Sequence, residues 1–447
     1  MQQIDFSQGS IRRRILAVAT PMLIAQLLNL LYNIVDRIYI GKIPGEGTLA
    51  LASIGLCFPF VTLITAFANL FGLGGAPLCA MARGKGNREG AQGIMVNAGF
   101  MLLLSGAVLT VLGIAFHRPL LYLFGASEVT YPYASSYIVI YLIGTLCVML
   151  SLGLNPYINC QGFARTGMLT VALGAAANIV LDPIFIFALH LGVRGAAIAT
   201  VLSQFLSAAW VVKFLTGKKA ELKLDFRGFR PDCQCIQRIT VLGIASFVMS
   251  FTDTLVQVAC NATLRNFGGD LYISVMTVLN SVRQIAQTPV LAIADGASTD
   301  ISYNYGARNY HRVVDTLKTA TIFAIAMLTA GWIIILIFAE PLCTIFGCTG
   351  ETLRHAAYTM RVYNLLLPLV PFGNVGSGFF QSIGQPKKSV FISLSRQILC
   401  LIPMVLILGN IFGQNGVLYA LPVADVASSA VALILMVMQC RHLRQNA

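Results

Sequence analysis

Runs of twenty or more apolar residues recur along the whole chain, and they strongly limit what the chain can fold into. A helix needs about 20 apolar residues to cross the hydrocarbon core of a bilayer. Twelve such segments are separated by short polar stretches in which proline, glycine and charged residues end the runs. They lie at Ile15–Gly41, Leu51–Ala82, Gly93–Phe116, Pro132–Leu154, Gly167–His190, Gly195–Leu215, Ile239–Leu264, Leu271–Ala297, Leu317–Ala339, Ala356–Phe380, Ser389–Gly409 and Gly416–Met438. The sequence therefore predicts an all-α polytopic membrane protein with twelve transmembrane helices.

The composition argues against the soluble classes of protein. Of the 447 residues, 57% are hydrophobic and 11% are charged, whereas a soluble domain carries about 25% charged residues. The net charge of +13 would suit nucleic acid, but most of the basic residues lie in short clusters between apolar runs. No His-Glu-x-x-His, Gly-x-Ser-x-Gly or Walker A motif occurs. We expect neither an enzyme nor a nucleic-acid-binding protein.

Lysine and arginine predict the orientation in the membrane. If the N-terminus is cytoplasmic, twenty-one basic residues fall on cytoplasmic segments and seven on outer segments. Cytoplasmic loops carry the excess of lysine and arginine in membrane proteins. We therefore expect both termini in the cytoplasm.

The two halves of the chain resemble each other at an offset of about 221 residues, so that Tyr141 matches Tyr363 and Pro183 matches Pro403. Each half holds six runs, an even number, so both halves enter the membrane from the same side. Transporters with such parallel repeats hold their substrate between the halves, near the membrane midplane. The predicted parts are an N-lobe at 1–215, a cytoplasmic linker at 216–238 and a C-lobe at 239–447.

Acidic residues within the apolar runs are costly, by at least about 2.5–3.5 kcal/mol each on insertion scales. Asp36 and Asp182 lie at a similar depth in the outer half of the N-lobe, together with Asn178, Thr200 and Tyr32. Oxygen ligands suit hard cations, and two carboxylates in one low-dielectric pocket cannot both ionise cheaply. These residues predict a site for a proton or a sodium ion, and no other metal site is expected.

A structural alternative for this acidic pair is that Asp36 pairs with a basic side chain and Asp182 caps a kink at Pro183. The second half carries apolar residues near the equivalent positions, so the helical scaffold does not require the acids. These positions are Val258, Ile398, Ile402 and Leu421. Pro21 lies in the same run as Asp36 and removes a helical hydrogen bond. We interpret it as a hinge whose bending depends on the ion at Asp36.

Further polar residues within the runs are candidates for lining a substrate cavity. Asp253, Asp295 and Asp425 share the C-lobe with Arg283 and Arg396. These five would form buried ion pairs, or the acids would line a cavity for a lipophilic cation, and the sequence leaves both readings open. The remaining candidates are the amides Asn29, Asn33, Gln257, Asn261, Asn280 and Gln284.

Long motifs carry a resemblance to a known family. They read Tyr32-Asn-Ile-Val-Asp36-Arg-Ile-Tyr-Ile-Gly41, Asn178-Ile-Val-Leu-Asp182-Pro-Ile-Phe-Ile-Phe187 and Gly192-Val-Arg-Gly-Ala-Ala-Ile-Ala-Thr200. Over essentially its whole length the chain resembles the bacterial multidrug and toxic compound extrusion (MATE) transporters. The resemblance implies a V-shaped pair of six-helix lobes in the inner membrane of a bacterium. It implies a monomer without a cofactor that exchanges outer H⁺ or Na⁺ for lipophilic, cationic drugs. It maps the cation site onto Asp36, Asn178, Asp182 and Thr200, with Tyr32 nearby.

The chain also departs from this family pattern. It reads Asp295-Gly-Ala-Ser-Thr299, followed by Asp300, where bacterial relatives carry Gln-Gly-x-Gln-Pro. Other branches of the family carry acidic cation ligands in their seventh and tenth spans. Here the tenth run has no acid and Asp253 in the seventh does not clearly match, so an ion site in the C-lobe is not expected. A major-facilitator antiporter is disfavoured because the loop Arg83-Gly-Lys-Gly-Asn-Arg88 lacks the aspartate of that fold's motif. A lipid-linked glycan flippase is the other alternative, but such proteins have a strongly cationic cavity and the basic residues within the runs here are few.

Overall fold

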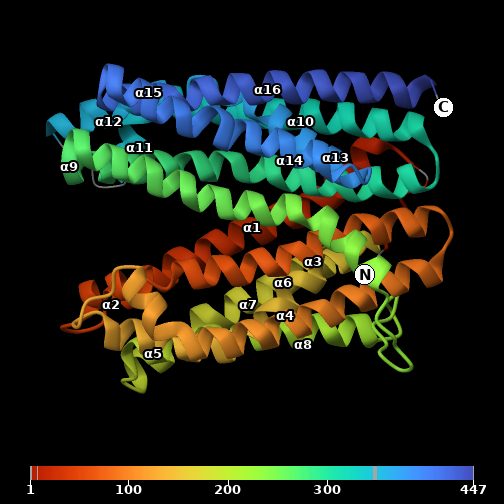
Figure 1. Cartoon of the computed structure of the whole chain (residues 1–447), viewed down its shortest axis with the longest axis horizontal. Helices are drawn as coiled ribbons and strands as arrows, with labels where there is room; N and C mark the ends of the chain where they lie inside the picture. The colour runs from red at the N-terminus through yellow and green to blue at the C-terminus, as the bar shows by residue number, and fades with distance from the viewer. Residues whose placement is uncertain (1–2, 8, 346–349, 446–447) are drawn as a thin grey trace. The chain divides into compact units, whose positions relative to one another are not determined.

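The computed structural model describes residues 3–7, 9–345 and 350–445. The side chains of these residues are described except at 48, 253–275, 277, 345, 350–352, 355, 414–415 and 417. Helices make up most of this part of the chain, the longest connection between them is 217–232, and no strand occurs in it (Figure 1). The predicted all-α fold class is confirmed. The chain divides into two compact units, residues 1–7 with 20–247 and residues 8–19 with 248–447.

Unit 1 is a bundle in which α3, α4 and α6 pack against one another, and α8 packs on α5, α6 and α7. A short π-helix, η1, follows α7 and also contacts α8. The helices are α1 (Ile11–Gly41, of which residues from Thr20 onward belong to this unit), α2 (Gly47–Gly55), α3 (Phe58–Gly84), α4 (Arg88–Leu123), α5 (Tyr131–Ile143), α6 (Thr145–Cys160), α7 (Ala164–Pro183), η1 (Ile184–Ala188) and α8 (Gly192–Thr216).

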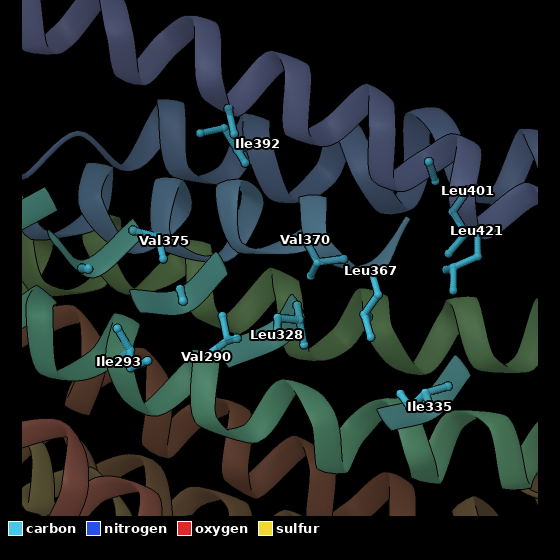
Figure 2. Close-up of a cluster of buried hydrophobic side chains, with 14 of the residues drawn as sticks. Val290, Ile293, Leu328, Ile335, Leu367, Val370, Val375, Ile392, Leu401 and Leu421 are labelled. Carbon is cyan, nitrogen blue, oxygen red and sulfur yellow. The ribbon is translucent and has the colours of Figure 1, made fainter. Parts of the chain in front are cut away.

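Unit 2 is a second bundle, in which α16 packs against α10, α13 and α15. Its helices are the part of α9 (Cys233–Gly306) from Val248 onward, α10 (Tyr310–Ile337), α11 (Ala339–Ile345), α12 (Gly350–Tyr363), η2 (Leu367–Leu369), α13 (Val370–Ser382), α14 (Pro386–Leu394), η3 (Ser395–Leu401), α15 (Ile402–Phe412) and α16 (Gln414–Gln445). Buried side chains from at least seven of these elements meet in one core. Figure 2 labels Val290, Ile293, Leu328, Ile335, Leu367, Val370, Val375, Ile392, Leu401 and Leu421 in it.

Nine helices in the described part of the chain are long and apolar enough to cross a membrane, and a tenth span forms if the bent pair α5–α6 is counted as one. That pair bends by 56° at its break, where Gly144 lies between the two helices. The remaining two predicted runs lie in α9 and in the broken series from α12 to α13. All twelve predicted runs are therefore helical, and some are interrupted.

Close backbone contacts hold α3 against the first part of α9 within unit 1. A Cβ atom at Gly243 would overlap the carbonyl oxygen of Leu70, and one at Gly74 would overlap the carbonyl oxygen of Ile239. Lipid tails are as apolar as leucine, so helices in a membrane associate through tight packing of this kind rather than through hydrophobic burial. Glycine at both positions lets the two backbones approach.

The segment predicted as a linker, 216–238, packs onto unit 1. The Leu222 amide donates a hydrogen bond of 2.9 Å to Oε1 of Gln161, and the side chain of Leu222 is buried. Arg83 forms a salt bridge with Glu221, and the Asp232 amide donates to Oδ1 of Asn97 at 3.0 Å. Unit 1 continues beyond this segment to Phe247, and unit 2 resumes at Val248.

Residues 8–19 lie in the first half of the sequence but belong to unit 2. Arg14 forms a buried salt bridge of 3.4 Å with Asp300, which also accepts a hydrogen bond of 2.6 Å from Thr316. Arg312 donates a hydrogen bond of 2.8 Å to the carbonyl oxygen of Gly9. Helix α1 thus begins in unit 2 and passes into unit 1 between Ala19 and Thr20.

Candidate functional site

The acidic pair predicted from the sequence comes together in unit 1. Helix α1 supplies Asp36, and α7 supplies Asp182 from its last turn. The two carboxyl groups lie within hydrogen-bonding reach of each other. Two carboxyl groups can share such a hydrogen bond only if one of them carries a proton, because a carboxylate has no donor of its own. A single bound cation, or a single shared proton, would therefore stabilise the two carboxyl groups.

The end of α7 shapes one side of this site. Asn178 lies one helical turn before Asp182, and its Nδ2 donates a hydrogen bond of 3.1 Å to Oδ1 of Asp182. Pro183 ends the helix, and the π-helix η1 follows it. Such π-turns are frequent at functional sites in helices. A Cβ atom at Gly195 would lie 2.5 Å from the carbonyl oxygen of Phe185, so glycine allows the first turn of α8 to pack on η1.

Three oxygen atoms of the site are buried and receive no hydrogen bond within the described part of the chain. They are Oδ1 of Asp36, Oδ1 of Asn178 and Oδ2 of Asp182. Asp182 is fully buried, and Asn178 is 2% exposed. Buried polar atoms are normally paired, so three such oxygens close together favour a ligand that supplies positive charge.

Within the described part of the chain, neither acid of the pair forms a salt bridge with a basic side chain. The four salt bridges among the described residues do not include Asp36 or Asp182. Arg37, the neighbour of Asp36, instead lies over the ring of Phe58, 5.2 Å from its centroid. Arg37 lies near enough to Asp36 to attract its carboxylate, but no salt bridge among the described residues holds this acid. Oxygen atoms without sulfur or imidazole are ligands for hard cations or a proton.

Hydroxyl groups border the acidic pair. Thr200 on α8 is half-buried, and its Oγ1 donates a hydrogen bond of 2.9 Å to the carbonyl oxygen of Ala196. Tyr137 on α5 is buried and lies in hydrogen-bonding contact with Thr200. Its ring stacks on that of Tyr141, with centroids 6.2 Å apart. The sequence analysis did not select Tyr137, because a tyrosine in an apolar run usually packs like any other aromatic residue. Tyr32 is half-buried on α1.

Of the amides predicted to line a cavity on α1, Asn29 and Asn33 are exposed. Nδ2 of Asn33 donates a hydrogen bond of 2.6 Å to the carbonyl oxygen of Asn29. Pro21 is buried two turns earlier in the helix.

In unit 2, Asp425 forms salt bridges with both Arg283 and Arg396. The ion-pair reading, which the sequence left open for this acid, is the observed one. Asn280 accepts a hydrogen bond of 2.6 Å from the hydroxyl of Tyr363. Gln284 and Asp295 are exposed on α9. The predicted cavity residues Asp253, Gln257 and Asn261 lie outside the residues whose side chains are described.

Within the described ranges, no group of three or more His, Cys, Asp or Glu side chains is placed to hold a metal ion. The pair of carboxylates in unit 1 is thus a two-acid site, with the amide of Asn178 bonded to Asp182.

The sequence of the chain is similar to a family model and to several known proteins. The MatE family model matches residues 21–184 and 245–407, one match in each half of the chain. The chain is 24% identical to the multidrug export protein MepA of Staphylococcus haemolyticus (strain JCSC1435) over 434 residues, which cover 97% of this chain and 95% of that protein. MepA of Staphylococcus aureus (strain MSSA476) is 21% identical, with 96% and 94% covered.

A solved structure is similar over the whole chain. It is the outward-facing conformation of a multidrug resistance MATE family transporter of the MOP superfamily, with a TM-score of 0.93 and 25% identity. The alignment covers 100% of this chain and 99% of the other.

Proposed function

The chain belongs to the MatE family of multidrug efflux transporters, and from this membership we propose that it is a secondary active exporter driven by an ion gradient. It moves lipophilic, cationic compounds out of the cell in exchange for inward-moving H⁺ or Na⁺. The protein is a multi-pass membrane protein, and we place it in the cytoplasmic membrane of a bacterium with both termini inside. We expect it to work as a monomer without a cofactor.

One observation carries this proposal: the carboxyl groups of half-buried Asp36 and buried Asp182 lie together, and neither forms a salt bridge among the described residues. An intramembrane acid without a counter-charge is costly and typically belongs to an ion pathway. The free oxygen atoms of Asp36, Asn178 and Asp182 would hold H⁺ or Na⁺, with Thr200 and Tyr32 at the rim. Export follows if the ion and the drug favour different conformations of the protein.

The test is export of a fluorescent lipophilic cation from liposomes that contain the purified protein. Ethidium is loaded with an imposed pH gradient, with an imposed Na⁺ gradient, or with neither. We expect one of the two gradients to accelerate export at least about tenfold, because a gradient supplies free energy only when its ion is bound in the cycle. The gradient that acts identifies the coupling ion. Equal rates under all three conditions would contradict antiport.

Pro21 is proposed as a hinge in the cycle. It lies beside the point where α1 leaves unit 2, and without an amide proton it leaves the carbonyl of Ala17 without its helical partner. We expect Pro21→Ala to slow gradient-driven export by about threefold to tenfold, since a stiffer helix resists the conformational step. The same liposome assay measures this. Pro119→Ala in α4, which lies wholly in unit 1, is the control and should leave the rate unchanged. A wild-type rate for Pro21→Ala would exclude the hinge.

A further inference from the structure

We propose that the segment between α8 and α9 binds the headgroups of anionic phospholipids. The site consists of five exposed basic side chains and one exposed aromatic ring. They are Lys218, Lys219, Lys223, Arg227, Arg230 and Phe226. The inference goes beyond the proposed export function and does not depend on it, because the site requires only that the protein lies in a membrane.

The segment, residues 217–232, lies at one surface of the membrane. It joins α8 to the first part of α9, and both are long and apolar enough to be membrane spans (Figure 1). It also packs on the adjoining ends of two further spans. Arg83 in the last turn of α3 forms a salt bridge with Glu221, and Arg88 at the start of α4 donates to the carbonyl oxygen of Glu221. The ends of four helices of unit 1 therefore border the segment, at the level where lipid headgroups lie.

The first part of the segment is held in place by buried leucines. Leu222 and Leu224 are buried, and their amides donate hydrogen bonds of 2.9 and 3.0 Å to acceptors elsewhere in unit 1. Lys223, between the two leucines, is exposed, and so are Lys218 and Lys219 just before them. The fold thus fixes the backbone and leaves the three lysine side chains facing outward.

Within the described part of the chain, no lysine or arginine of the segment forms a salt bridge. Each of the three acids of the segment has another role. Glu221 pairs with Arg83, and Oδ1 of Asp225 accepts a hydrogen bond of 2.9 Å from the Arg227 amide. Oδ1 of Asp232 accepts hydrogen bonds from amides in the first turn of α9. The segment therefore presents an excess of positive charge that calls for an anion.

Aromatic side chains set the depth of the second part of the segment. The rings of Phe226 and Phe229 meet edge to face with centroids 5.9 Å apart, and Phe229 also lies 5.6 Å from the ring of Phe100 on α4. Phe100 lies about 18 Å along α4 from its first residue, at a rise of 1.5 Å per residue. Phe226 is 39% exposed. Aromatic rings are typical of the boundary between lipid and water. At this depth Phe226 contacts acyl chains, while Arg227 and Arg230 reach the headgroups.

The combination of charge and aromatic surface selects a lipid over a soluble anion. Basic residues near a membrane surface attract anionic lipids, and each added residue strengthens the attraction. Phe226 adds an apolar contact that a soluble anion cannot use. Orientation of the chain needs only a count of basic residues on each side of the membrane. The lipid site needs more, because Leu222, Leu224 and Phe229 must hold the basic residues together.

The test is the melting temperature of the purified full-length protein in detergent. It is titrated with dioleoylphosphatidylglycerol, with dioleoylphosphatidylcholine or with inorganic phosphate, and we expect only the first to raise the melting temperature. Lys218→Gln/Lys219→Gln/Lys223→Gln should need about tenfold more phosphatidylglycerol for half of the rise. Phe226→Ser keeps every charge and should need about threefold more. These side chains are exposed, so the variants should fold.

A matched control removes the same charge from another place. Lys318→Gln/Lys387→Gln/Arg441→Gln neutralises three exposed basic residues of unit 2 and should titrate like the wild type. A second measurement counts, by mass spectrometry, the phosphatidylglycerol molecules that remain on each protein through purification. This number should fall in the variant of the three segment lysines and stay unchanged in the control.

Four results would each overturn the proposal. Equal stabilisation by phosphatidylcholine would show that acyl chains bind without the headgroup, and equal stabilisation by phosphate would show that the ligand is a soluble anion. Equal weakening in the unit 2 control would show that surface charge acts without a site. A wild-type titration by the variant of the three segment lysines would show that the lipid binds elsewhere. None of these results bears on the export function, which is measured separately.

Discussion

Asp182→Asn and Asp36→Asn are each expected to lower gradient-driven export by about a hundredfold or more, because a charge-assisted contact to the coupling ion is lost. Asparagine has nearly the same shape as aspartate but cannot take up a proton and carries no charge for a sodium ion. The two carboxyl groups lie within hydrogen-bonding reach of each other, so we expect them to act as one unit. The double variant should therefore be no slower than either single variant.

The measurement is the liposome assay with the imposed gradient, together with equilibrium binding of ethidium to the detergent-solubilised protein. Binding should survive in both variants, because the acids couple the ion rather than hold the drug. Asp225→Asn is the matched control, since Asp225 is an exposed carboxylate in the same unit outside the apolar runs. Full coupled export by both single variants would show that the ion binds elsewhere.

Asp425→Asn is expected to be the most destabilising single change in unit 2. It would leave the guanidinium groups of Arg283 and Arg396 facing a neutral amide in a buried place. Removing one partner of a buried ion pair typically costs about 3–5 kcal/mol. We expect a markedly lower melting temperature in detergent and a lower yield of folded protein.

A second substitution should partly reverse this loss. Arg283→Gln combined with Asp425→Asn removes one of the two positive charges, so the double variant should melt above the Asp425→Asn variant. Asp315→Asn is the control, because Asp315 is exposed on α10 and such changes usually stay within about 0.5 kcal/mol. If Asp425→Asn melts with the wild type, the ion pairs contribute nothing to stability.

The helical architecture could be predicted from sequence because one physical requirement dominates it. A segment that crosses lipid must satisfy its backbone hydrogen bonds internally, so length and apolarity are sufficient to predict a helix. The interruptions were less predictable. Gly144 and Pro183 both lie within predicted runs, but only the neighbouring helices decide whether such a residue bends a helix, breaks it or is tolerated.

The candidate sites show a similar limit. Depth along the helices suggested that Asp36 and Asp182 meet, and the structure brings them together, although their role stays a prediction. Asp425 was ambiguous because its partners, Arg283 and Arg396, are far from it in sequence and come from other helices. Pairing of this kind depends on tertiary packing, which hydropathy does not encode.

The division of α1 between the two units determines which residues must be exchanged together when one half of the chain is replaced by that of a relative. The halves of the sequence look like two copies of one module, but the first half contributes residues 8–19 to the body of the second. A chimaera joined at the central polar stretch would combine an Asp300 from one parent with an Arg14 from the other. The exchangeable module is therefore discontinuous, and a lobe swap between relatives must carry the first turns of α1 along with residues 248–447.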